Sequence, residues 1–202
     1  MNVKTVKRED LDKFLNTEDK RSVNIALKSM LFLGMVSISM FFAGLTYAYI
    51  VRKADVNRNW MDFILPDWFL VSTIVIVLSS FLLFFVKRRL KNNNSVFGLV
   101  CSVLILGLIF SFIQFKGWEQ LISQGVFLTG EGSNAAGSFL YVLTLAHLAH
   151  LFGGIIALIF ATVNAKLRLY TIDSYLSLKL ISMYWHFLTI LWVLLFLFLK
   201  FL

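Results

Sequence analysis

Five stretches without a charged residue constrain the fold of this chain more than any other feature of its sequence. They cover residues 29–51, 68–86, 96–115, 137–163 and 180–199, together more than half of the 202 residues. Each is close to the roughly 20 apolar residues with which a helix crosses about 30 Å of hydrocarbon. Strands of a membrane barrel would alternate apolar and polar residues instead. Because backbone groups in lipid must be bonded within their own segment, the pattern predicts an all-α integral membrane protein, a bundle of five transmembrane helices.

The distribution of basic residues predicts how the bundle is oriented. Most of the 19 Lys and Arg lie before the first span, between the second and third spans, and between the fourth and fifth. Such residues favour the cytoplasmic side, so the N-terminus is predicted in the cytoplasm and the C-terminus on the outer side. The group Lys87, Arg88, Arg89 and Lys91 is interpreted as a stop-transfer and lipid-headgroup cluster. No nucleic-acid partner is expected.

The chain is predicted to form one membrane domain after a short tail. Residues 1–28 are rich in charge and lack the apolar core and cleavage site of a secretory signal, so they are predicted to be a cytoplasmic tail. No repeat or Gly/Ser linker divides residues 29–202. The single cysteine, Cys101, has no partner for an intrachain disulfide and no second thiolate for a metal site.

The fourth span carries a stripe of small residues that indicates close helix packing. It consists of Ala149, Gly153, Ala157 and Ala161, spaced every four residues. Another helix can approach such a stripe closely. Packing within this chain and contact with a different subunit are both compatible with it.

The titratable residues of the spans limit the chemistry. No Asp or Glu lies inside the five stretches, which argues against an autonomous proton pump or cation transporter. All three histidines, His147, His150 and His186, lie within predicted spans, and His147 and His150 share one helix face. A haem held by His150 or His147 together with His186, or a three-histidine metal site, is one interpretation. The favoured interpretation is neutral histidines bonded to hydroxyls, carbonyls, Gln114, lipid headgroups or a partner, with Gln114 itself bonding between helices.

Several short motifs, ordered along all five spans, resemble subunit III of the haem-copper terminal oxidases. The motifs are Phe41-Phe42-Ala43-Gly44 with Ala48, Leu65-Pro66 with Ser72-Thr73, Gln114, Gly137-Ser138 followed by His147-Leu148-Ala149-His150 and Gly153-Gly154, and Tyr184-Trp185-His186-Phe187 with Trp192. Each motif alone is weakly specific, but their shared order over roughly residues 30 to 200 is specific.

The resemblance implies a core subunit without redox centres in a proton-pumping respiratory oxidase of the cell inner (cytoplasmic) membrane. Its partner would be subunit I, which holds the haems and copper, beside other oxidase subunits. The implied role is to stabilise subunit I, bind phospholipid and sustain proton uptake, with no activity alone and no metal or cofactor in this chain. The complex would oxidise cytochrome c or quinol. The residues expected to contact lipid or a neighbouring subunit are His147, His150, His186, Trp185 and Gln114.

The chain also departs from the family pattern. It is similar to a short, five-helix form that lacks the first two helices of the long form. Three positions where the family often has acids hold Ile38, Gly117 and Thr189, so a role of those acids with protons does not carry over. Two other hypotheses stay open from the sequence: a small haem-binding electron-transfer protein, and a membrane scaffold unrelated to respiration.

Overall fold

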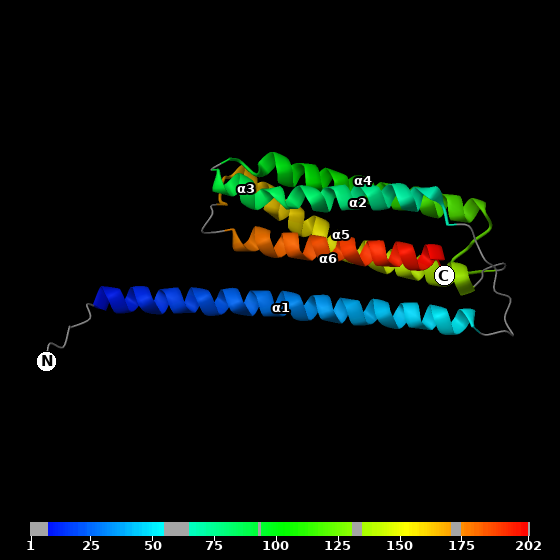
Figure 1. The fold of residues 1–202 in the computed structure, drawn as a ribbon, viewed down its shortest axis with the longest axis horizontal. Coiled ribbons are helices and arrows are strands. Elements are labelled where there is room, and N and C mark those ends of the chain that lie inside the picture. The colour runs from blue at the N-terminus through cyan, green and yellow to red at the C-terminus, as the bar shows by residue number, and fades with distance from the viewer. Residues whose placement is uncertain (1–7, 55–64, 93, 131–134, 171–174, 202) are drawn as a thin grey trace.

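Helices form nearly all of the described chain. The computed structural model describes residues 8–54, 65–92, 94–130, 135–170 and 175–201, and no strand occurs among them. The helices are α1 (Arg8–Lys53), α2 (Asp67–Leu83), α3 (Phe85–Lys91), α4 (Phe97–Ser123), α5 (Ala135–Lys166) and α6 (Leu176–Phe201), shown in Figure 1. Five segments are long and apolar enough to cross a membrane, with α2 and α3 together forming one of them. The prediction of an all-α bundle with five membrane-spanning helices is confirmed.

The helices extend beyond the charge-free stretches. Helix α1 begins at Arg8 and therefore includes most of the segment interpreted as a tail; the position of that segment outside the membrane stays a prediction. The second span is divided at Phe84, whose amide donates to the carbonyl of Phe81 at 3.2 Å, three residues back. This tighter turn separates α2 from α3, which carries the basic cluster.

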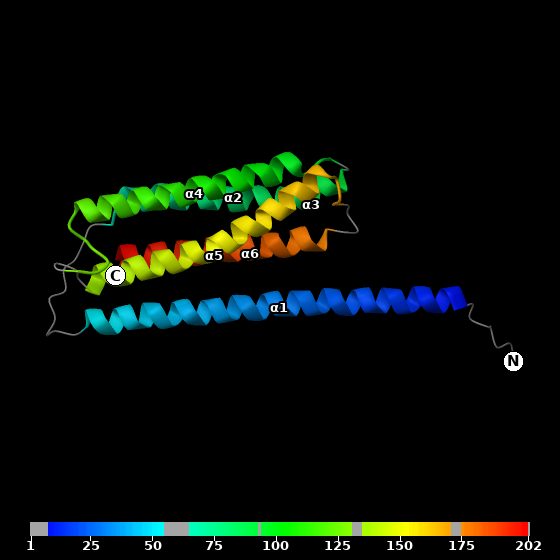
Figure 2. The same cartoon turned by 180° about the vertical axis from the view of Figure 1, so that it is seen from behind.

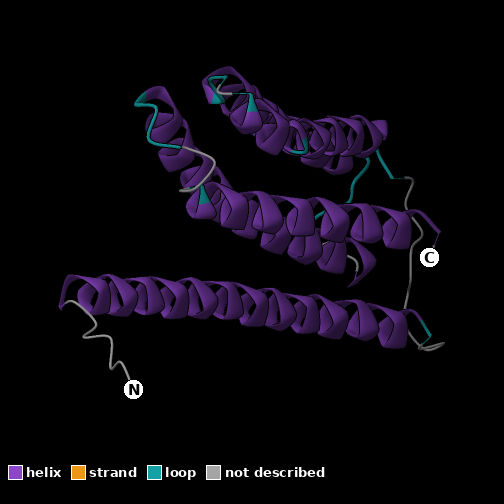
Figure 3. Cartoon of the chain, turned by 60° about the vertical axis from the view of Figure 1, so that its left-hand side comes forward, coloured by secondary structure: helices purple, strands orange, loops and turns teal. Residues whose placement is uncertain are grey.

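Four of the membrane helices pack together, and α1 lies against one side of them. Helix α2 packs along α4, α5 lies between α4 and α6, and α6 also contacts α2. Helix α1 packs against α5 and α6, and the views in Figures 2 and 3 show it set apart from α2 and α4. In its most apolar window only 6% of α1 is buried, against 33–44% for the other spans. Most of the apolar surface of α1 is therefore uncovered in this chain.

Aromatic side chains fill the centre of the four-helix group. Phe69 of α2 and Phe110 of α4 both contact the indole of Trp192 on α6, with ring centroids 6.1 and 5.2 Å apart. All three side chains are almost completely buried. Since lipid is as apolar as these side chains, van der Waals packing and interhelical hydrogen bonds hold such a bundle together.

Candidate functional site

His147 lies at the point where four helices meet. It is completely buried on α5, and aromatic rings from three other helices surround it. The ring centroids of Phe42 on α1, Phe110 on α4 and Trp192 on α6 lie 6.5, 6.1 and 4.9 Å from that of the imidazole. Neither ring nitrogen has a hydrogen-bond partner among the described residues. Packing, with aromatic rings of three helices among the contacts, therefore holds this imidazole in the structure.

His150 lies one turn further along α5, beside α1. Its Nδ1 lies 2.7 Å from the carbonyl oxygen of Ala146, and since a carbonyl only accepts, Nδ1 carries the proton in this bond. The ring lies against Phe42, 5.7 Å between centroids, so Phe42 contacts both histidines of α5. The backbone carbonyl of His150 accepts a hydrogen bond from the Tyr184 hydroxyl of α6 at 3.2 Å. His150 thus lies where α1, α5 and α6 adjoin.

His186 belongs to a different environment. Its Nδ1 lies 2.5 Å from the hydroxyl oxygen of Ser80 on α2, and its ring stacks on Phe84 with centroids 4.6 Å apart. The contacts of His186 and those of His147 have no residue in common. In the described part of the chain, no three His, Cys, Asp or Glu side chains form a group that could hold a metal ion. The structure therefore brings His147 and His150 together but not His186.

Hydroxyls of α2 form hydrogen bonds with the neighbouring helices, and we call the four residues Ser72, Thr73, Ser79 and Ser80 the hydroxyl seam. The Gln114 amide of α4 donates to Ser72 at 2.8 Å, as predicted for a bond between helices. The indoles of Trp185 and Trp192 on α6 donate to Ser79 and Thr73 at 2.9 and 3.0 Å, and Ser80 pairs with His186.

Each of three seam hydroxyls also donates a hydrogen bond within α2. The hydroxyls of Ser72 and Thr73 donate to the carbonyl of Phe69, and that of Ser79 donates to the carbonyl of Ile76. A hydroxyl that donates to its own helix is left with lone pairs that accept from another helix. The seam therefore joins α2 to α4 and α6 without leaving these hydroxyls unsatisfied in an apolar interior.

Curated relatives of the chain are named as subunit 3 of an oxidase. No family model matches the chain. It is 32% identical over 165 residues to a probable cytochrome c oxidase subunit 3 of Nocardia farcinica, a match that covers 76% of this chain and 77% of the relative. It is also 32% identical over 169 residues to the probable cytochrome c oxidase subunit 3 of Mycobacterium tuberculosis, covering 78% of each. The chain belongs to the subunit III family of haem-copper oxidases. The resemblance found in its motifs is confirmed.

The oxidase subunit III family includes relatives named for a second electron donor. A probable quinol oxidase subunit 3 of Staphylococcus epidermidis is 32% identical to this chain over 135 residues, 63% of each protein. The names of these relatives therefore include both cytochrome c oxidases and a quinol oxidase.

Trp185 of this oxidase subunit III lies inside the bundle, between two glycines. Its side chain is completely buried. A Cβ at Gly107 of α4 would lie 2.7 Å from the far edge of its six-membered ring, and a Cβ at Gly154 of α5 would lie 3.2 Å from another edge. The sequence analysis named Trp185 and, within a family motif, Gly154, but it did not connect the two, and it missed Gly107 and Ser79. Glycines at the interior of predicted spans, where Gly otherwise weakens a helix, are the signal that points to them.

The small-residue stripe of α5 is only partly covered by this chain. Ala161 is buried and Ala157 half-buried, but Ala149 and Gly153 are exposed, and a Cβ at Gly153 would meet no atom within 4 Å. Residues four apart rotate by about 40° per step around a helix of 3.6 residues per turn, so one stripe faces different surroundings along its length. Contact of Ala149 and Gly153 with another subunit stays a prediction.

The interior polar groups of this subunit III are suited to joining helices. They are hydroxyls, a carboxamide, indoles and imidazoles, and the apolar stretches of the sequence hold no Asp or Glu. Such neutral groups form directional hydrogen bonds in an apolar medium, whereas intramembrane proton relays commonly use carboxylates. The site is therefore a set of interhelical contacts centred on α2, α5 and α6.

Proposed function

We propose that this oxidase subunit III is a non-redox core subunit of the inner membrane that stabilises the catalytic subunit I, holds phospholipid and sustains proton uptake. The uncovered surface of α1 carries this proposal. Because only 6% of the most apolar window of α1 is buried, a large apolar face is left for another membrane partner. Relatives named as oxidase subunits support an oxidase subunit as that partner.

A groove between α1 and α6 supports the proposed role in holding lipid. It has a volume of about 470 Å³, and apolar side chains such as Phe42, Phe187 and Phe198 line most of it. Its two hydroxyls, from Ser39 and Thr46, donate to backbone carbonyls of α1. The groove therefore offers an apolar surface that suits an acyl chain.

Support for proton uptake would act through subunit I rather than through a relay in this chain. At all three positions where the family often has acids, the residues have structural contacts instead. A Cβ at Gly117 would lie 3.0 Å from the ring of Phe69, and the hydroxyl of Thr189 donates to the carbonyl of Trp185 at 2.9 Å. The third, Ile38, packs against the core.

The histidines fit this proposal as contacts that fix helices against one another and against lipid or a partner. His150 is half-buried beside the exposed helix α1, and His186 is half-buried beside Phe84. Both therefore keep surface that a phospholipid or a neighbouring subunit can cover. His147, Trp185 and Gln114 act from inside the bundle by setting the faces that the helices present.

Co-purification tests the proposed function. The chain carries an affinity tag and is purified in mild detergent from membranes of its own cells, with an equally tagged unrelated membrane protein as control. We expect haem-copper subunits and their haem absorption with the tagged chain and not with the control. After the partners are removed, we expect no Soret band from the chain. A Soret band retained by the isolated chain and lost in His150→Ala or His186→Ala would replace this proposal with the haem-binding alternative.

A further inference from the structure

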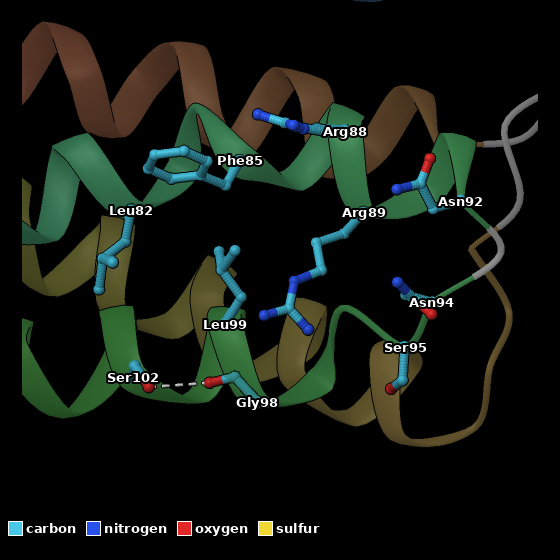
Figure 4. A pocket seen from close by; sticks show the side chains of 10 residues that line it. All are labelled: Leu82, Phe85, Arg88, Arg89, Asn92, Asn94, Ser95, Gly98, Leu99 and Ser102. Atoms are coloured by element: carbon cyan, nitrogen blue, oxygen red, sulfur yellow. Dashed lines mark hydrogen bonds between the residues drawn. The ribbon is translucent and has the colours of Figure 1, made fainter.

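A pocket opens between α3 and the start of α4, at the end of the bundle where α5 ends and α6 begins. It has a volume of about 540 Å³. Figure 4 shows Arg89 extending from α3 into the pocket toward the first turn of α4, with Asn94 and Ser95 in the connection beside it, whereas Arg88 extends along the opposite edge of α3, away from Arg89. Polar groups thus gather at one side of the pocket.

The polar side of the pocket is positively charged. Arg88 and Arg89 form no ion pair with a carboxylate among the side chains that the structure describes. The first turn of α4, including Gly98 and Leu99, also lines the pocket. The first amides of a helix have no acceptor within it and carry a partial positive charge. The guanidinium group of Arg89 and the helix N-terminus that it approaches are donors that suit a phosphate oxygen.

A second pocket of about 300 Å³ adjoins the first, because Asn94 and Ser95 line both. It adds Arg168, which follows the end of α5. Arg168 has a φ of 54°. Its amide donates to the carbonyl of Ala165, and that of Leu169 donates to the carbonyl of Asn164. In this helix-ending motif the left-handed position is usually glycine. Arg168 occupies this position although a non-glycine residue is strained there, and it brings a third arginine to the lining of the two pockets.

The opposite side of the first pocket is apolar. Leu82 of α2, Phe85 of α3 and Leu99 of α4 line it, and these residues lie in segments apolar enough to span the membrane. A free phosphate ion would use only the arginine side. A phospholipid would use both sides, since its headgroup phosphate would meet Arg89 while the start of its acyl chains lies on Leu82, Phe85 and Leu99.

We propose that these adjoining pockets bind an acidic phospholipid, with the phosphate held by Arg89 and the first amides of α4, and the negative charge further balanced by Arg88 and Arg168. This site is separate from the groove between α1 and α6. The inference deepens the proposed role in holding phospholipid and rests on it only for the class of ligand. Binding to the chain alone tests this site, whereas co-purification tests membership of the complex, so the two can fail separately.

Native mass spectrometry of the full-length chain in detergent tests the site, with phosphatidylglycerol, phosphatidylcholine of the same acyl chains, and inorganic phosphate as probes. We expect the wild type to bind phosphatidylglycerol more tightly than phosphatidylcholine. The double variant Arg88→Gln/Arg89→Gln is expected to lower the affinity for phosphatidylglycerol about tenfold. Its matched control is Lys87→Gln/Lys91→Gln, which removes the same charge from α3 at positions that do not line the pocket.

Two glycine positions provide a second, independent pair of variants. A Cβ at Gly98 meets no atom within 4 Å, so Gly98→Leu is expected to fill the pocket and weaken binding of phosphatidylglycerol without disturbing the core. Gly153→Leu, also in open space, is the control. Arg168→Gly is expected to relieve the backbone strain and still weaken binding, which separates loss of the ligand from loss of the fold.

Several results would overturn the proposal. Equal losses in Arg88→Gln/Arg89→Gln and Lys87→Gln/Lys91→Gln would show general attraction of charge. Equal affinity of the wild type for phosphatidylglycerol and phosphatidylcholine would contradict an acidic-lipid site. Displacement of phosphatidylglycerol by an excess of inorganic phosphate would assign the pocket to a soluble anion. Unchanged binding in Arg88→Gln/Arg89→Gln and Gly98→Leu, in protein that melts as the wild type does, would also refute the site.

Discussion

At the scale of single residues, the position of Trp185 depends on what its neighbours lack. Its indole donates to Ser79, and its six-membered ring lies between Gly107 and Gly154. The hydrogen bond on one side and the glycine of α5 on another leave the ring little room to move. A tryptophan is therefore accommodated in the centre of the bundle only because two facing helices present backbone without side chains.

The substitution Gly107→Ala tests this fit. The added Cβ would lie 2.7 Å from the Trp185 ring, and forcing an extra carbon into a packed core costs about 1–3 kcal/mol. Part of that cost is offset by the better helix propensity of Ala, about 1 kcal/mol. We expect a net loss of about 1 kcal/mol in the free energy of unfolding, measured by denaturation in detergent. The control Gly153→Ala, with no atom within 4 Å, should be neutral or slightly stabilising. Equal stabilities of the two variants would contradict the fit described for Trp185.

At the scale of helices, the hydroxyl seam makes α2 the element to which α4 and α6 are hydrogen-bonded. The seam residues are spaced so that Ser72 and Thr73 lie about two turns from Ser79 and Ser80. Thr73 bonds to Trp192 of α6, while Ser79 and Ser80 bond to Trp185 and His186 further back along α6. Ser72 bonds to Gln114 of α4. Two sets of bonds at different depths fix the rotation and the axial position of α6 against α2.

A double-mutant cycle between Ser79→Ala and Trp185→Phe measures one of these bonds. Interhelical hydrogen bonds in membrane proteins couple by about 0.6 kcal/mol on average and by about 1.7 kcal/mol at most. We expect Ser79→Ala to lower the free energy of unfolding by less in the Trp185→Phe background than in the wild type. The expected difference is about 0.6 kcal/mol. The indole is then absent, so the hydroxyl has no donor to lose. A coupling energy of zero within error would mean that the 2.9 Å contact contributes nothing to stability.

The five spans could be predicted from the sequence because their charge-free length has one physical solution in lipid. The partners of the helices could not be predicted in the same way. Apart from the Ser and Thr positions of α2, these helices are apolar around most of their circumference, so no charged face marks which side is covered by protein and which by lipid. Trp185 suits both a lipid interface and a core, and only the positions of Gly107 and Gly154 in space show that it lies in the core. The bond of Gln114 was predictable since a buried amide needs a partner, but its partner Ser72 was not.

At the scale of the whole molecule, the fold gathers basic residues at one end. Lys87, Arg88, Arg89 and Lys91 lie in α3, and Lys166, Arg168 and Lys179 flank the connection from α5 to α6. Figure 1 shows these segments at the same end of the bundle as the first part of α1. The opposite end, where α4 stops at Ser123 and α5 begins, carries fewer basic residues. The charge asymmetry read from the sequence is therefore an asymmetry between the two ends of the folded bundle.

This asymmetry predicts that the α3 end faces the cytoplasm, because basic residues near span ends favour that side. The chain has one cysteine, so Cys101→Ser gives a background in which single cysteines report accessibility. Lys91→Cys places a thiol at the end of α3, and Gln124→Cys places one just after α4; both positions are exposed. In intact cells, a membrane-impermeant maleimide should modify the Gln124→Cys variant and leave the Lys91→Cys variant unmodified. After lysis, it should modify both. Modification of Lys91→Cys but not Gln124→Cys in intact cells would reverse the orientation, and it would place the pocket of Arg88 and Arg89 in the outer leaflet.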